Sequence, residues 1–166
     1  MHDMITTAAS AISGAGGMQM THYMELLATN QPWNLIIFMA IPVILAEALT
    51  ATEFLVLFKK EYHDKLRPIN KIIGIVLGIY FTGIFVYLIT NVYPSIQWRS
   101  IGDFIAVNSY MSGVIFLAGI ALLELGVIAK TVTEEKKRLY HVMLLIGFLV
   151  VAHIAMIFGM LNPSIF

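Results

Sequence analysis

Two histidines, at positions 141 and 153, lie within the last long hydrophobic stretch of the chain. The stretch has no Asp, Glu, Lys or Arg between residues 142 and 161, and ~20 apolar residues are enough to cross a bilayer as a helix. An ionisable group at membrane depth is costly unless it has a partner or a ligand. Because imidazole is a common axial ligand of haem iron, His141 and His153 are the first candidates for cofactor binding.

The spacing of these histidines is compatible with two cofactors stacked across the bilayer. Twelve residues correspond to about 18 Å along a helix axis, although they also rotate the helix by ~120°, so that the two rings would not share one face. We therefore expect haem b, with one pair of ligands near each membrane surface. The candidate ligands are His63 with His141 on one side, and His153 with His22, Met39 or Met111 on the other.

Each histidine also has a simpler interpretation. His63 and His141 lie next to basic segments and are compatible with ordinary residues of the membrane interface. His153 is near the middle of its span, where a hydrogen bond to Glu47 or to a hydroxyl of a neighbouring helix would satisfy it. No second span carries a matching pair of histidines, which is the main argument against two haems.

Methionines indicate a second chemistry, the binding of copper or another metal ion. His153, Met156 and Met160 occur at i, i+3 and i+7 and therefore share one helix face. Thioethers together with imidazole suit Cu(I). With the tail segment Met18-x-Met20-x-His22-x-Met24, this spacing is similar to the methionine motifs of copper-uptake proteins, a family that has three spans. The alternative is that methionine serves only as packing material.

Three glutamates lie inside hydrophobic spans and form a third group. Glu53 and Glu124 are at similar distances from the ends of their spans, and Glu47 lies deeper, close to the level of His153. Such a line of protonatable groups, continued by His141, suits a path for protons or metal ions. The candidate metal ligands are Glu47, Glu53, Glu124, His153, Met156 and Met160. The alternative is that each carboxyl is protonated and bonded to a neighbouring helix.

The composition identifies the class of protein that must position these groups. Of 166 residues, 59% are hydrophobic and 12% charged, and the formal net charge is zero, whereas soluble domains are about one-quarter charged. The absence of cysteine excludes disulfides, zinc–thiolate sites and iron–sulfur clusters. There is no large basic patch for nucleic acid, no phosphate loop, no nucleophile elbow and no zinc helix. We predict an all-α, polytopic membrane protein, and we favour one without catalysis of its own.

Hydropathy predicts four transmembrane helices, at about residues 33–58, 72–93, 104–129 and 140–161. We expect two charged loops between the spans. The first covers residues 59–71 and contains Pro68, and the second covers residues 130–138. Residues 1–32 form a tail outside the transmembrane domain 33–166, with a short interfacial helix from Thr21 to Ala28. The pair Gly74-x-x-x-Gly78 allows another helix to approach closely.

The basic residues predict the orientation. Nine of the ten Lys and Arg follow the first or third span, and Arg99 alone lies on the other side. The positive-inside rule therefore places both basic loops in the cytoplasm and both termini outside. We expect a four-helix bundle in a bacterial cytoplasmic membrane.

These observations leave three functions open. The first is electron transfer by haem b, or by a metal ion, within the bundle, because four helices are a sufficient frame for one or two haems. The second is a small metal-ion or proton-coupled transporter that uses the glutamates and methionines. The third is an accessory subunit of a larger membrane complex. The expected partners are the lipid bilayer and either other membrane subunits or further copies of the chain.

Overall fold

The structure is a computed structural model that describes residues 20–128 and 130–161. Four of its helices are long and apolar enough to cross a membrane, and no strand occurs in the described ranges. The predicted all-α fold with four membrane-spanning helices is confirmed. The first crossing consists of α3 (Trp33–Leu35), η1 (Ile36–Ala40) and α4 (Ile41–Phe58); the others are α5 (Lys60–Tyr87), α6 (Ile101–Glu124) and α7 (Glu134–Met160).

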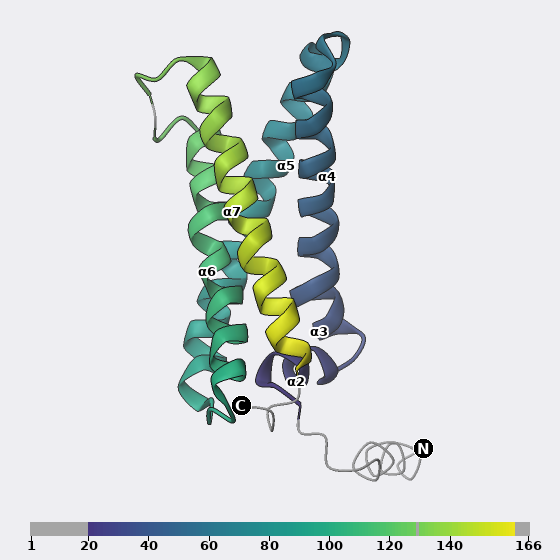
Figure 1. The fold of residues 1–166 in the computed structure, drawn as a ribbon, viewed down its shortest axis with the longest axis vertical. Coiled ribbons are helices and arrows are strands. Elements are labelled where there is room, and N and C mark those ends of the chain that lie inside the picture. Colours follow the sequence, from purple (N-terminus) through teal and green to yellow (C-terminus); the bar gives the residue numbers. More distant parts are fainter. Residues whose placement is uncertain (1–19, 129, 162–166) are drawn as a thin grey trace.

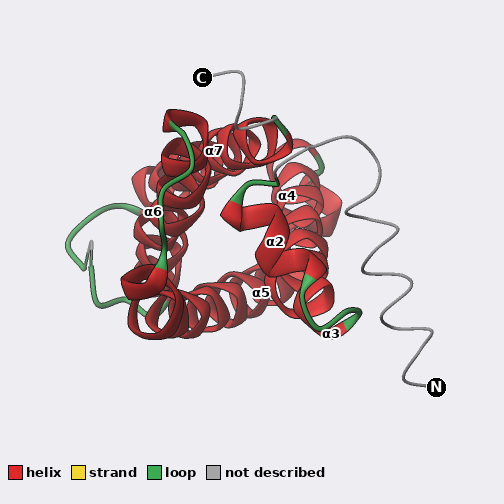
Figure 2. Ribbon diagram, turned by 90° about the horizontal axis from the view of Figure 1, so that it is seen from below, coloured by secondary structure: helices red, strands yellow, loops and turns green. Residues whose placement is uncertain are grey.

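The four crossings run up and down in sequence order (Figure 1). Helix α4 packs against α5, α5 against α6, and α6 against α7, whereas α4 and α7 make few direct contacts. Viewed along the bundle, the four helices form a ring (Figure 2). The end that carries the α4–α5 and α6–α7 connections is called here the loop end, and the opposite end is called the α2 end.

The prediction of a loop over residues 59–71 is wrong. Only Lys59 interrupts the helices, with an extended backbone (φ −124°, ψ 98°), and α5 starts at Lys60 and continues through Pro68. Lys, Glu and Arg are good helix formers, so a charged segment outside the lipid need not be a loop. The side chain of Asn70 also attaches this part of α5 to α4, by donating to the Leu49 carbonyl (3.3 Å) and to Thr52 Oγ1 (3.0 Å).

Two further boundaries differ from the hydropathy estimate. Helix α6 ends at Glu124, before the predicted residue 129, because Gly126 adopts a left-handed conformation (φ +73°) and Val127 N donates back to the Leu122 carbonyl (2.9 Å). Helix α7 starts at Glu134 and not at residue 140, with two glutamates in its first turn, where negative charge stabilises a helix. Hydropathy does not detect helix ends: α6 stops at its glycine turn while the sequence is still apolar, and α7 begins six residues before its apolar part.

A short helix, α2 (His22–Ala28), occurs where the sequence predicts one. It crosses one end of the ring of four helices (Figure 2). Thr21 is buried and donates from Oγ1 to the Gly159 carbonyl of α7 (2.6 Å). Leu27 is buried in the core of the bundle. Helix α2 therefore closes this end of the bundle.

The close approach expected at Gly74-x-x-x-Gly78 is confirmed between α5 and α6. A Cβ atom at Gly78 would lie 2.5 Å from Ala121 Cβ and 2.5 Å from the Leu117 carbonyl oxygen. Only glycine fits at this crossing, and the close contact fixes α5 against α6.

Candidate functional site

A cavity of about 490 Å³ lies between α4 and α7, in the half of the bundle nearer α2. Its volume is typical of sites for small molecules or cofactors. The apolar part of its lining includes Phe38, Met39, Phe81, Phe148 and Met156. The polar part consists of Tyr23, Glu47, Thr50, Ser109, Tyr110 and His153, and no described Lys or Arg belongs to it. Helix α2 contributes Tyr23, whose burial raises the pKa of its phenol and keeps it neutral.

His153 lines this cavity and forms a hydrogen bond within its own helix. Its Nδ1 lies 2.6 Å from the Leu149 carbonyl oxygen, one turn earlier on α7. A carbonyl oxygen only accepts hydrogen bonds, so Nδ1 carries the hydrogen and Nε2 of the neutral ring carries a lone pair. No described residue bonds to this Nε2. Metal-ligating histidines have this arrangement, with the second ring N–H donated to a carbonyl or a carboxylate.

The wall opposite α7 begins in a π-helical turn, η1, which carries Phe38 and Met39. Such turns occur frequently at functional sites. Two tyrosines of neighbouring helices hold the turn: Tyr110 donates to the Phe38 carbonyl (2.6 Å) and Tyr80 to the Ile37 carbonyl (3.0 Å). Met39 therefore lies on a fixed segment and lines the same cavity as His153.

The structure brings only part of the predicted His/Glu/Met set to the cavity. Glu47 and Met156 line it together with His153. Met160 is 72% exposed and is not part of the lining, although it follows Met156 by one turn. Among the residues that the structure describes, Glu47 is the only charged side chain on the cavity wall.

The other two glutamates of the predicted set, Glu53 and Glu124, lie nearer the loop end, as do His141 and Asn70; the four residues are called here the loop-end cluster. All four side chains are buried, and each comes from a different spanning helix. His141 Nδ1 lies 2.9 Å from Glu124 Oε1. The expected continuous line of protonatable groups is thus divided between the cavity and this cluster.

His63 and His141 are not arranged as two ligands of one iron. The nitrogens of His63 face Asp64 (Nδ1, 3.2 Å) and Arg138 (Nε2, 2.8 Å). Neither nitrogen is left for a metal. His141 uses its Nδ1 for Glu124 and leaves its Nε2 without a partner, so the expected pair fails at His63 and not at His141.

His22 holds α2 in place at the opposite end. Its backbone N (2.7 Å) and its Nδ1 (2.5 Å) bond to the two carboxylate oxygens of Asp103, which is fully buried. Arg99 adds contacts to Asp103 through its backbone N (3.4 Å) and to Glu25 through Nη2 (2.7 Å). A carboxylate that accepts several hydrogen bonds in a buried position is a strong attachment point.

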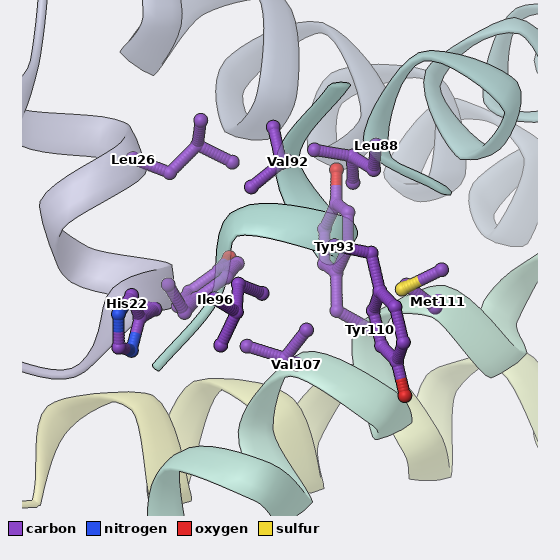
Figure 3. A pocket seen from close by; sticks show the side chains of 10 residues that line it. His22, Leu26, Leu88, Val92, Tyr93, Ile96, Val107, Tyr110 and Met111 are labelled. Carbon is purple, nitrogen blue, oxygen red and sulfur yellow. The ribbon is translucent and has the colours of Figure 1, made fainter. Parts of the chain in front are cut away.

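The space beside His22 is too small for a cofactor. It is a crevice of about 20 Å³ with His22 on one side and Leu88, Tyr110 and Met111 on the other (Figure 3), which is room for about one water molecule. Asp103 is not among the residues predicted from the sequence to form a site. The Ser100-x-x-Asp103 spacing at a helix start was the available signal, since Ser100 Oγ accepts from Asp103 N (3.1 Å).

No three His, Cys, Asp or Glu side chains are grouped closely enough to hold a metal ion within residues 20–128 and 130–161. Met18, one part of the methionine pattern in the tail, lies outside the described residues. The arrangement around His153 therefore offers one imidazole and neighbouring thioethers, not a cage of several ligands.

A family model described as "Family of unknown function (DUF6803)" matches residues 18–166. The chain belongs to this family. The matched region of the DUF6803 chain includes all four spanning helices, α2 and the whole cavity lining. No curated protein and no solved structure matches the chain.

Proposed function

We propose that this protein binds haem b in the α4/α7 cavity and transfers electrons within the membrane. The observation that carries the proposal is the imidazole of His153, which lines a cavity of about 490 Å³ and is held by the bond between its Nδ1 and the Leu149 carbonyl, and no described residue bonds to its Nε2. A porphyrin supplies four iron ligands, so the protein needs to add only one or two. The absence of a three-residue metal cluster among the described residues is therefore compatible with haem, and less so with a bare metal ion.

Met39 is the best candidate to hold the haem together with His153. It lies on the wall opposite His153, on the turn that Tyr80 and Tyr110 hold. Ligation by histidine and methionine is found in electron-transfer cytochromes, where it raises the reduction potential. The apolar and aromatic lining would exclude water from the cofactor. When bound, haem would supply reversible one-electron chemistry that the side chains of the cavity lack.

An absorption spectrum tests this proposal directly. Protein purified from haem-supplied cells should have a Soret band and an equimolar amount of non-covalent haem, because no cysteine is present for covalent attachment. Elemental analysis of the same sample separates haem iron from bare copper or iron. A preparation that stays colourless after incubation with haem would contradict the proposal.

One observation favours a second function, proton-coupled transport of a cation. Within the described part of the chain, Glu47 is the only charged residue on the cavity wall, no Lys or Arg lies beside it there, and several aromatic rings line the same wall. A carboxylate beside aromatic faces suits an organic cation. In that case haem-free protein in vesicles would move a lipophilic cation in response to a pH gradient, and Glu47→Gln would abolish the movement.

We further infer that the loop end faces the cytoplasm of a bacterial cell and that α2 faces outward. Nine of the ten basic residues belong to the segments next to the loop end, and cytoplasmic loops carry such an excess. Arg99, at the α2 end, bonds to Glu25.

Single cysteines test this orientation without background, because the natural chain has none. In intact cells, an impermeant thiol reagent should label Gln97→Cys and spare Glu135→Cys, both of which are exposed positions. After the membrane is opened, both variants should react. The reverse pattern in intact cells would show that the orientation is wrong.

A further inference from the structure

The α4/α7 cavity is open on one side. Of the described residues that line it, four are exposed: Val43 and Glu47 of α4, and His153 and Met156 of α7. The lining residues that come from η1, α2, α5 and α6 are all buried or half-buried. The exposed positions therefore lie along the edges of α4 and α7, which make few direct contacts with each other. The opening between these two edges is called here the slot.

The slot belongs to the lipid-facing surface of the bundle. On α4, Ile44 precedes Glu47 by three residues and is 63% exposed. On α7, Val150 and Ile157 lie three residues before and four residues after His153, and both are exposed. Residues three or four apart share one face of a helix. Each edge of the slot thus continues into exposed apolar side chains, the surface that a spanning helix turns towards lipid.

The depth of the slot agrees with this placement. Glu47 follows Trp33, the start of the first crossing, by 14 residues, which is about 21 Å along a helix axis. The hydrocarbon layer of a bilayer is about 30 Å thick. Glu47 therefore lies well inside this layer, and so does His153, which lines the same cavity.

The route from water at the α2 end is closed by several contacts. Tyr23 of α2 lines the cavity, and its ring packs on Gly159 of α7, where a Cβ atom would lie 2.6 Å from Tyr23 Cδ1. Thr21 bonds to the carbonyl of the same glycine (2.6 Å), and His22 bonds to the buried Asp103. Entry from water at this end would require α2 to detach, whereas entry through the slot requires no contact of α2 to break.

We propose that the α4/α7 cavity takes up its ligand from the lipid, through the slot. The ligand class is then a lipid-soluble ring molecule with at least one polar group. The rings match the apolar and aromatic walls, and the polar group meets Glu47 or His153 at the edge of the slot. This inference rests on the cavity of the proposed function and narrows its ligand, since haem is a largely apolar macrocycle and meets the description. A strongly hydrophilic ligand does not.

Photolabelling of the full chain in lipid nanodiscs, before haem is added, tests the route. The probe is a neutral phenyldiazirine, which partitions into the bilayer and on illumination inserts into nearby C–H bonds. It should label Phe81, which lines the cavity although it is only 2% exposed. It should spare Leu77, one turn earlier on α5, which is fully buried and outside the lining. Mass spectrometry of the peptides measures both positions.

A charged, water-soluble diazirine should label neither Phe81 nor Leu77. Labelling of Phe81 by the charged probe would show that the cavity is reached from water and would overturn the proposal. Failure of the neutral probe to label Phe81 would overturn it as well.

Val43→Trp places a larger side chain at the edge of the slot and should reduce the labelling of Phe81 to the level of Leu77. The matched control is Ile79→Trp, which adds the same side chain at an exposed position of α5 outside the cavity lining and should leave the labelling unchanged. Met156→Trp tests the opposite edge if Val43→Trp fails to fold. Undiminished labelling in a folded slot variant would mean that the probe enters elsewhere, against the proposal.

The route and the haem assignment fail separately in this experiment. A protein that binds no haem but is labelled at Phe81 contradicts haem binding and supports the slot. A protein that binds haem but is not labelled at Phe81 before haem is added supports haem binding and contradicts the slot.

Discussion

Replacing His153 with alanine should remove haem from the purified protein and abolish its Soret band. Loss of an outer-shell partner typically lowers metal affinity by about 10–100-fold, so loss of the ligand itself should lower haem affinity by at least ~100-fold. The fold should survive, because His153 is exposed to the cavity and bonds only within its own helix. Titration of the apoprotein with haem, followed at the Soret maximum, measures the effect.

Three comparisons distinguish loss of ligation from general damage. His63→Ala should keep the haem, because both ring nitrogens of His63 already face other side chains. Imidazole added to His153→Ala should restore part of the band by occupying the vacated space. Met39→Ala should retain haem with an altered spectrum and a lower reduction potential. A His153→Ala protein that binds haem as tightly as the parent would exclude His153 as the ligand.

Gly78→Ala should destabilise the bundle by about 1–3 kcal/mol, the usual cost of overpacking. The added methyl group would meet Ala121 Cβ and the Leu117 carbonyl oxygen at 2.5 Å. A backbone carbonyl cannot rotate away, so α5 and α6 would have to separate. Reversible unfolding in mixed detergent micelles gives the difference in free energy of unfolding.

Gly83 provides the matched control on the same helix. A Cβ atom there meets no other atom within 4 Å, and alanine is favoured over glycine in a helix by roughly 0.5–1 kcal/mol. Gly83→Ala should therefore be as stable as the parent or slightly more so. Equal stability of Gly78→Ala and the parent would show that the α5–α6 crossing can relax.

Much of the architecture was predictable from the sequence because lipid imposes simple requirements. A segment that crosses the bilayer must be apolar and must satisfy its own backbone, which only a long helix does. The four spans, the short helix before Trp33 and the glycine contact at Gly78 follow from such local signals. The similar depth of Glu47 and His153 along the bundle was also predictable, since the position of a residue along a helix follows from counting residues.

The helical structure of residues 60–71 and the grouping of the candidate ligands could not be predicted in this way. Hydropathy reports where a helix enters lipid and not where it ends, so the helical start of α5 at Lys60 was missed. Likewise, the engagement of His22 with Asp103 depends on residues 81 positions apart in the chain. No local pattern contains such a contact.

By itself, the sequence determined that this is a four-span helical membrane protein and which ionisable groups lie at membrane depth. The tertiary structure alone decided the direction in which each of them points. His153 and Glu47 line one cavity, while Glu53, Glu124 and His141 are buried in another part of the bundle. The physical reason is that spans surrounded by lipid are apolar on every side, so no polar face marks their rotation, and only the packing of one helix against the next sets it.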